Sequence, residues 1–225
     1  MSLIQWVLWK FFQGLTALMF RVDGAELAKV PRQGPLIVVA NHVHIPEIPT
    51  LYTRLFPRKI RGMVQAERVF DKNITGWVLR VFGTIPVRRG EADLNALRTG
   101  IRTLAEGNMV LIDPEGTRSH DGRLQKGQPG VIVMALHSGA PLLPVVHYGS
   151  ENYSENLRRL RRTDLHYVVG KPFRIHADAQ RITSVLRQQI TDQVMLQMAA
   201  LLPAKYRGAY AGGDASVHPH LEFAG

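Results

Sequence analysis

Short apolar runs alternate with segments of helical periodicity along most of the chain. Continuous apolar runs at 36–40, 109–112 and 142–148 predict buried strands. Apolar residues at helical spacing predict amphipathic helices at 93–105 and 182–202. Further strands are expected at 62–66, 84–87 and 166–169, and further helices at 47–55, 74–82 and 131–138. Strands that alternate with helices favour an α/β fold, a single domain with a largely parallel central sheet flanked by helices.

The first 22 residues form an apolar segment of a different kind. It carries Trp6 and Trp9, and Lys10 lies near its middle. A central lysine costs a membrane-spanning helix about 2.5–3.5 kcal/mol, and tryptophan prefers the headgroup level. We therefore expect residues 1–22 to form a membrane-associated helix at the interface rather than a spanning one. An amphipathic helix packed on the protein's own core is the alternative.

The rest of the chain shows no second domain. No internal repeat and no linker interrupts residues 23–207, which we interpret as one folded domain. Residues 208–225 contain Gly212-Gly213 and show little periodicity, so we expect a flexible tail. The segment 1–22 has no basic n-region and no small-residue cleavage site, and a signal peptide is not expected.

Composition narrows the possible chemistry. The chain has 225 residues, of which 45% are apolar, enough for a sizeable core. It contains no cysteine, which excludes disulfides, thiolate catalysis and cysteine-ligated zinc. The net charge of +10 suits an anionic partner. Nucleic acid is not expected, because no aromatic residues interleave with the basic clusters. The arginine cluster at 158–162 is either a solvated face or a contact for lipid headgroups.

The strand predicted at 36–40 ends in Asn41-His42-Val43-His44-Ile45-Pro46-Glu47. A histidine that takes a proton from an alcohol needs a carboxylate to orient its ring and to stabilise the charged imidazolium. His42 and Glu47 supply such a pair from one turn. The pattern is weak by itself, because a histidine and a glutamate at this spacing often occur by chance.

A second polar loop follows the strand at 109–112. Gly116 allows a ligand to approach the backbone, Thr117 offers a hydroxyl, and Arg118 has a planar fork suited to phosphate. Glu115 either accepts hydrogen bonds from a substrate hydroxyl or holds Arg118 in place. In an open parallel sheet, ligands bind outside the carboxyl ends of the strands, so the two loops can face one site. A purely structural loop closed by a Glu–Arg pair is the alternative.

Four blocks of the sequence resemble the glycerolipid acyltransferases typified by bacterial 1-acylglycerol-3-phosphate acyltransferase. The family's Asn-His-x-x-x-x-Asp block corresponds to Asn41, His42 and Glu47. Its second block, a Gly followed by a short strand and Arg, is similar to residues 83–89. Its Phe-Pro-Glu-Gly-Thr-Arg-Ser block resembles residues 113–119, and its apolar-Pro-apolar block resembles 143–145.

The resemblance implies a mechanism without a covalent enzyme intermediate. His42 would act as general base on a hydroxyl of the acceptor, and Glu47 would stabilise the imidazolium. The acceptor oxygen would then attack the thioester carbonyl of acyl-CoA or acyl-carrier protein. No metal and no prosthetic group are required.

The resemblance also implies a binding site for a (lyso)glycerophospholipid such as 1-acylglycerol 3-phosphate. Arg89 and Arg118, with Lys126, would bind its phosphate, and Glu115 would position its glycerol backbone beside Gly116 and Thr117. Such an enzyme would serve phospholipid biosynthesis or remodelling on the cytoplasmic face of a membrane, where the N-terminal helix would bring the site to the lipid.

Three positions depart from the family pattern. Glu47 stands where Asp is usual, Asp113 where an aromatic residue is usual, and Gln128 near a common lysine. The extra methylene of Glu47 requires the backbone to lie further back to orient the same ring. Two other functions remain open: a non-catalytic lipid-binding protein, and a metal-dependent hydrolase that uses His42, His44 and Glu47.

Overall fold

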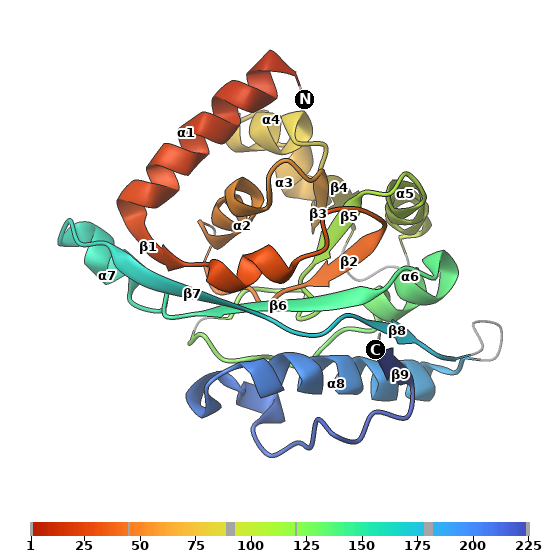
Figure 1. The fold of residues 1–225 in the computed structure, drawn as a ribbon. Helices are drawn as coiled ribbons and strands as arrows, with labels where there is room; N and C mark the ends of the chain where they lie inside the picture. The colour runs from red at the N-terminus through yellow and green to blue at the C-terminus, as the bar shows by residue number, and fades with distance from the viewer. Residues whose placement is uncertain (1, 45, 89–92, 120, 178–181, 224–225) are drawn as a thin grey trace.

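The computed structural model describes residues 2–44, 46–88, 93–119, 121–177 and 182–223. Within these ranges the strands join into one sheet in the order β1-β7-β6-β2-β5-β3-β4, with β8 beside β6 and β9 beside β8 (Figure 1). The strands are β1 Phe20–Asp23, β2 Leu36–Val39, β3 Ile60–Gln65, β4 Ile85–Val87, β5 Met109–Ile112, β6 Leu142–Tyr148, β7 Thr163–Val169, β8 Phe173–Ile175 and β9 Leu221–Phe223.

The centre of the sheet is parallel, as the alternation of strands and helices predicts. β6, β2, β5, β3 and β4 run in the same direction, and Val38 of β2 lies between Leu111 of β5 and Leu143 of β6. Antiparallel pairs occur only where β7 and β8 join β6 and where β9 joins β8, among the strands that the structure describes. The carboxyl ends of β2, β5 and β6 therefore meet at one edge.

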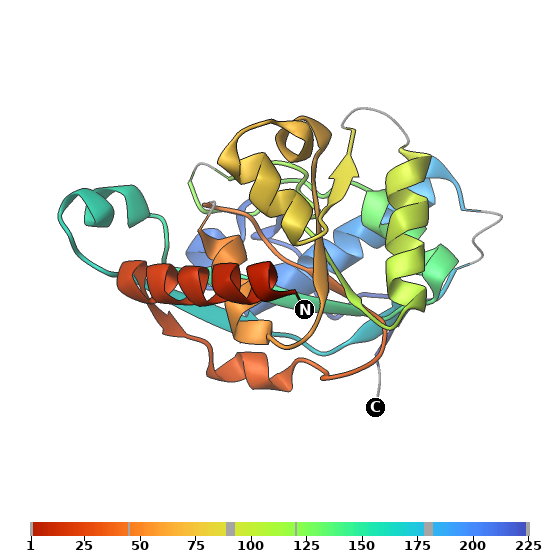
Figure 2. The ribbon, with the colours of Figure 1, turned by 90° about the horizontal axis from the view of Figure 1, so that it is seen from above.

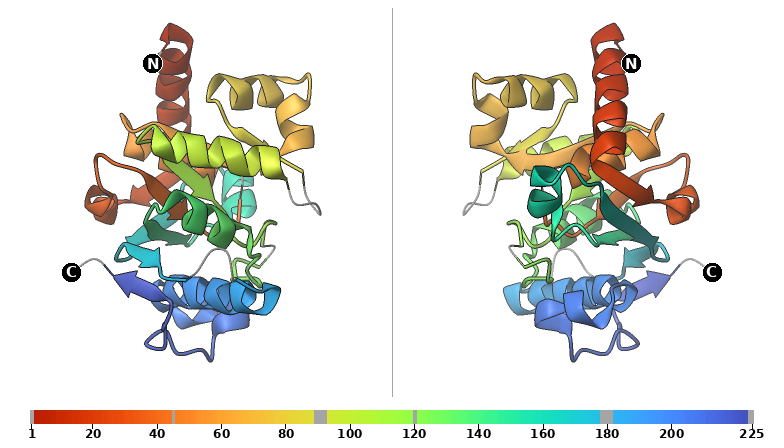
Figure 3. Two further views of the ribbon diagram at one scale, coloured as in Figure 1. Left: turned by 90° about the vertical axis from the view of Figure 1, so that its right-hand side faces the viewer. Right: turned by 90° about the vertical axis from the view of Figure 1, so that its left-hand side faces the viewer.

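Helices cover both faces of the sheet (Figures 2 and 3). Ile37 and Val39 of β2 belong to the core under one set of helices, and Leu36 and Val38 belong to the core under the other. A strand covered on both faces reads as a continuous apolar run rather than an alternating one. The helices are α1 Leu3–Met19, α2 Glu47–Leu55, α3 Ala66–Phe70, α4 Ile74–Val81, α5 Leu94–Ala105, α6 Gly130–Ser138, α7 Tyr153–Arg158 and α8 Ser184–Leu201.

Helix α1 begins at a capping box and then lies across the molecule. The Ser2 side chain accepts the backbone N–H of Gln5, and the Gln5 side chain accepts that of Ser2. The Gln5 side chain also donates to the Val81 carbonyl of α4, and the Trp9 indole donates to the Thr53 carbonyl of α2. α1 thus bridges α2 and α4. No described helix has the length and apolar character needed to cross a membrane.

The chain ends differ from the sequence expectation. Residues 20–23 leave the helix and form β1, which pairs with β7. The segment expected as a flexible tail packs on the protein: Tyr210 is buried, and its hydroxyl donates to Asp192 and accepts the N–H of Gly127. Strand β9 pairs with β8 in three registered positions. Tyr210 and Leu221 are buried only through long-range contacts, so local periodicity gave no signal for them.

Candidate active site

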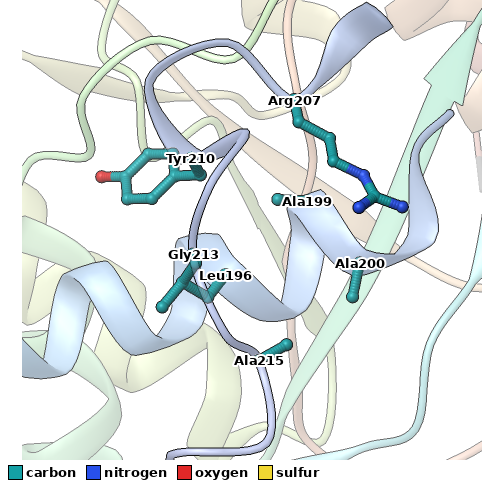
Figure 4. Close-up of a pocket in the computed structure, with 7 residues that line it drawn as sticks. All are labelled: Leu196, Ala199, Ala200, Arg207, Tyr210, Gly213 and Ala215. Atoms are coloured by element: carbon teal, nitrogen blue, oxygen red, sulfur yellow. The ribbon is translucent and has the colours of Figure 1, made fainter. Parts of the chain in front are cut away.

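Two hollows differ sharply in what lines them. The smaller, about 180 Å³, lies at the end of α8 and is lined by Leu196, Ala199, Ala200, Arg207, Tyr210, Gly213 and Ala215 (Figure 4). Its one charged group, Arg207, donates from Nε to the Leu202 carbonyl at 3.0 Å. This hollow contains no residue that the sequence singles out for chemistry, and its charged group is already engaged by the backbone.

The larger hollow, about 1330 Å³, holds the candidate chemistry. His42, Asp113, Thr117 and Arg118 line it, and it extends along the whole of β3. Much of its wall is apolar and comes from α1, α2 and α4: Leu8, Trp9, Phe12, Ile48, Tyr52, Val78, Leu79 and Phe82. The structure therefore brings the histidine of one motif and the arginine of the other to a single, largely apolar hollow.

The loop that carries His42 is tied to the end of β6. The Asn41 side chain donates to the His147 carbonyl at 2.9 Å and accepts the His147 N–H at 2.9 Å. The His147 Nε2 lies 2.7 Å from the Asn41 carbonyl oxygen, so Nε2 carries the hydrogen in this bond. Asn41 and His147 are both buried. These three bonds fix the start of the loop that carries His42 across neighbouring strands, and sequence spacing gave no sign of His147.

The carboxylate of Glu47 is buried and held from several sides. Its Oε2 accepts the backbone N–H groups of Val43 at 3.1 Å and His44 at 2.6 Å. Its Oε1 accepts the hydroxyl of Ser150, and His147 Nε2 lies 3.5 Å from Oε2. The extra methylene of glutamate is thus used to reach the end of β6. Ser150 is a residue that sequence reasoning missed, because its partner lies 103 positions away.

Glu115 joins the two motifs. One carboxylate oxygen accepts the backbone N–H of His42 at 3.2 Å, and the other accepts that of Gln125 at 2.8 Å. Ser119 adds a bond from its N–H to the His42 carbonyl at 2.8 Å. Burial raises the pKa of Glu115 from its usual 4.5 to about 7, although both hydrogen bonds act in the opposite direction. These contacts hold the His42 backbone. The sequence predicted other roles for Glu115, a bond to a substrate hydroxyl or to Arg118.

The structure places the other predicted site residues differently from one another. Gly116 has a φ of +68°, a conformation that favours glycine, and its N–H donates to the Asp113 carbonyl at 3.0 Å, which turns the loop toward Thr117 and Arg118. Lys126 is exposed and is not among the residues that line the hollow. Arg89 lies outside the described residues.

The structure offers no support for the metal-dependent alternative. In the ranges described, no three histidine, aspartate or glutamate side chains gather as a metal site requires. Both oxygens of Glu47 already accept hydrogen bonds from the loop and from Ser150.

Comparisons with known proteins agree with this geometry. The chain is 26% identical over 160 residues to 1-acyl-sn-glycerol-3-phosphate acyltransferase BAT2 of Brassica napus. This match covers 68% of the chain and 45% of the relative. The chain is also 33% identical over 126 residues to the lyso-ornithine lipid O-acyltransferase of Pseudomonas aeruginosa. This match covers 56% of the chain and 45% of the relative. The chain thus spans less than half the length of these curated relatives.

A solved structure shares the fold. The crystal structure of the 1-acyl-sn-glycerophosphate acyltransferase PlsC from Thermotoga maritima matches with a TM-score of 0.59 and 23% identity, over 86% of this chain and 76% of that one. The family model described as Acyltransferase matches residues 21–148, which hold both motifs and the sheet edge that joins them. The chain therefore belongs to the acyltransferase family.

Proposed function

We propose that this acyltransferase moves a fatty acyl group from acyl-CoA or acyl-carrier protein to the free hydroxyl of 1-acyl-sn-glycerol 3-phosphate. One observation carries the proposal: His42 and Arg118 line the same hollow as a wall of apolar side chains. A phosphorylated lipid acceptor needs all three features, a base for its hydroxyl, a cation for its phosphate and apolar surface for its chain. The matched plant relative bears the name of this activity.

His42 acts as the general base in this proposal. Its ring takes the proton of the acceptor hydroxyl while that oxygen bonds to the thioester carbonyl carbon. The carbon–sulfur bond then breaks, and the thiol leaves with the proton that the imidazolium returns. Glu47 would stabilise the imidazolium, as a buried carboxylate does for histidine in acyl transfer. No metal or prosthetic group takes part in these steps.

The size of the hollow supports a long acyl chain as ligand. Its volume of about 1330 Å³ exceeds the roughly 300–1,000 Å³ that is typical of small-molecule sites. Pairs of aromatic rings line it, with Trp9 of α1 lying 4.5 Å from Phe56 and Phe12 lying 6.3 Å from Phe82, centroid to centroid. A fatty acyl chain fits an apolar channel of this kind.

A second acceptor deserves a direct test. The relative with 33% identity is named as an acyltransferase of lyso-ornithine lipid, which is an amino-lipid. Its acceptor hydroxyl would use the same base, but no phosphate would face Arg118. The two acceptors therefore predict different consequences for the loss of Arg118.

Membrane association through α1 is part of the proposal. Large apolar side chains project from this helix into solvent, and Leu3 and Leu18 at its two ends are 76% and 74% exposed. A helix that exposes such a face is suited to lie in the interface of a bilayer. The cytoplasmic face is the proposed location, because the acyl donors are supplied there.

The test combines an acceptor panel with one variant. The purified protein is incubated with labelled acyl-CoA or acyl-carrier protein and with 1-acylglycerol 3-phosphate, glycerol 3-phosphate or lyso-ornithine lipid, and the product lipid is identified. His42→Ala should lower kcat by about 10²–10⁴-fold while vesicle binding persists. His137→Ala, at an exposed histidine of α6, should change neither. Full transfer by His42→Ala would exclude His42 as the base, and binding without transfer in the unmodified protein would indicate a lipid-binding protein.

A further inference from the structure

We propose that residues 149–162, the α7 hairpin between β6 and β7, form a second membrane contact that binds anionic phospholipid beside the active site. The proposal goes beyond the interfacial role of α1, because it assigns a separate surface and a charge preference. It rests on the proposed function only in placing the enzyme at a lipid surface.

The tip of the α7 hairpin exposes a leucine in an unfavourable backbone conformation. Leu160 is 95% exposed and has a φ of +52°, the only non-glycine residue with a positive φ in the part of the chain that the structure describes. This region of φ and ψ disfavours residues with a branched side chain and favours glycine. Leu157, one turn earlier, is 47% exposed. Folding buries almost none of Leu160 and leaves about half of Leu157 exposed, whereas insertion into a bilayer would bury both.

Two arginines of the hairpin bond to other residues, and two form no ion pair with any described residue. Arg159 pairs with Glu155 at 2.8 Å, and Arg162 donates to the Phe20 carbonyl at 2.7 Å. Arg158 and Arg161 are exposed and form no ion pair with any described residue. Two guanidinium groups beside two exposed leucines match the phosphate and acyl layers of an anionic bilayer.

The hairpin lies next to the end of α1. The Tyr153 ring stacks on Phe20, the residue that caps α1, with centroids 5.3 Å apart. Figure 1 shows α7 projecting beyond the C-terminal end of α1, and Figure 2 shows the same arrangement from above. Leu18, in the last turn of α1, is 74% exposed. The hairpin therefore lies beside the C-terminal end of α1, and in this proposal one bilayer contacts both.

The hairpin also contacts the loop that carries His42. Tyr153 lies 5.7 Å from His44, centroid to centroid, and Ser150, at the base of the hairpin, donates to Glu47. A bilayer bound at Leu160 would therefore lie near the loop that carries His42. The exposed Leu157 and Leu160 favour a lipid partner over an acidic protein, because the acyl layer of a bilayer would bury them.

The test measures vesicle binding of the full chain by co-sedimentation. Vesicles of phosphatidylcholine are compared with vesicles that also contain phosphatidylglycerol. Leu160→Gly keeps the backbone conformation and removes the apolar group, and Arg158→Gln with Arg161→Gln removes the two unpaired charges. Arg98→Gln with Arg102→Gln, two exposed arginines of α5, is the control with an equal loss of charge.

Binding to the anionic vesicles should weaken about tenfold in Leu160→Gly and about 25-fold in the double arginine variant, at about fivefold per arginine. The arginine effect should vanish on pure phosphatidylcholine. The melting temperature of Leu160→Gly should not fall, which separates the binding effect from misfolding. The control pair should change binding by about twofold at most, as expected from long-range charge alone.

Three results would overturn the proposal. The first is that the hairpin variants bind vesicles as the unmodified protein does. The second is that the control pair loses as much affinity as the hairpin pair. The third is that vesicle binding of the hairpin variants stays intact while their transfer from acyl-carrier protein alone declines. The last result would assign the hairpin to the carrier protein. Vesicle binding requires no catalysis, so His42→Ala should bind normally, and a failure of the proposed activity would leave these measurements valid.

Discussion

The buried carboxylate of Glu115 accepts the backbone N–H of His42 at 3.2 Å, so this side chain joins the two motifs of the site. The same carboxylate accepts the N–H of Gln125, further along the second loop. Because His42 is held through its backbone, its ring position depends on a residue that does not line the hollow.

Glu115→Gln should change the pH dependence of stability. Burial raises the pKa of Glu115 from 4.5 to about 7, so the folded state binds this proton more tightly than the unfolded state. The free energy of unfolding of the unmodified protein should therefore fall as the pH rises from about 4.5 to about 7, by about 3 kcal/mol at most. The variant lacks this titration. The free energy of unfolding, measured in urea across that pH range, should decrease less in Glu115→Gln than in Glu222→Gln, a control at an exposed residue.

Ser150→Ala should lower both stability and turnover. The substitution leaves a buried oxygen of Glu47 without its hydroxyl donor, which costs about 1–3 kcal/mol. If Glu47 orients His42, kcat should fall while the KM for the acceptor stays near its original value. Ser150→Thr, which keeps the hydroxyl, should recover part of the loss. Ser154→Ala, at an exposed position of α7, should behave as the unmodified protein, and unchanged kcat in Ser150→Ala would separate Glu47 from catalysis.

Glu47→Asp should lower activity, although aspartate is the residue usual in the family. The longer side chain reaches both the N–H groups of its own loop and Ser150 at the end of β6. A shorter one cannot keep both sets of bonds without moving the backbone. We expect a loss of about tenfold in kcat, from about 1.4 kcal/mol. The losses of Glu47→Asp and Ser150→Ala should be less than additive, because both remove the same contact. Higher activity in Glu47→Asp would contradict this account.

Arg118→Lys should distinguish the two candidate acceptors. A planar guanidinium binds a phosphate through two parallel hydrogen bonds, and an ammonium does not. With 1-acylglycerol 3-phosphate, the KM should rise about tenfold, the effect of losing about 1.4 kcal/mol of binding. With a lyso-ornithine lipid it should change little. Arg123→Lys, an exposed residue of the same region that pairs with Asp121 at 3.7 Å, is the matched control.

Val78→Trp should shift the preferred donor toward shorter acyl chains. Val78 lines the large hollow from α4 and is half-buried, so an indole there would occupy space that a long chain needs. Transfer of long chains should fall more than transfer of short ones when the two compete in one assay. Val185→Trp, at an exposed position of α8, should leave the ratio unchanged. An unaltered chain-length profile in Val78→Trp would place the acyl chain outside this hollow.

Residues 36–40 and 109–112 show why the central fold could be read from the sequence. Each run is apolar at every position because the strand is covered on both faces, and the observed strands are Leu36–Val39 and Met109–Ile112. The polar loops that follow them carry His42 and Arg118, which share the hollow as the parallel order of the strands predicts. Strand β1 and helix α7 were not predicted, because they are short and depend on partners distant in sequence.

The sequence by itself placed the candidate residues: a histidine and a carboxylate after one buried strand, and a loop ending in threonine and arginine after another. These features are local, since periodicity and loop composition act over a few residues. Only the tertiary structure decided what holds them. Ser150 reaches Glu47 across 103 positions, and Glu115 reaches His42 across 73. Such contacts arise when parallel strands place their carboxyl ends side by side, and no local pattern records them.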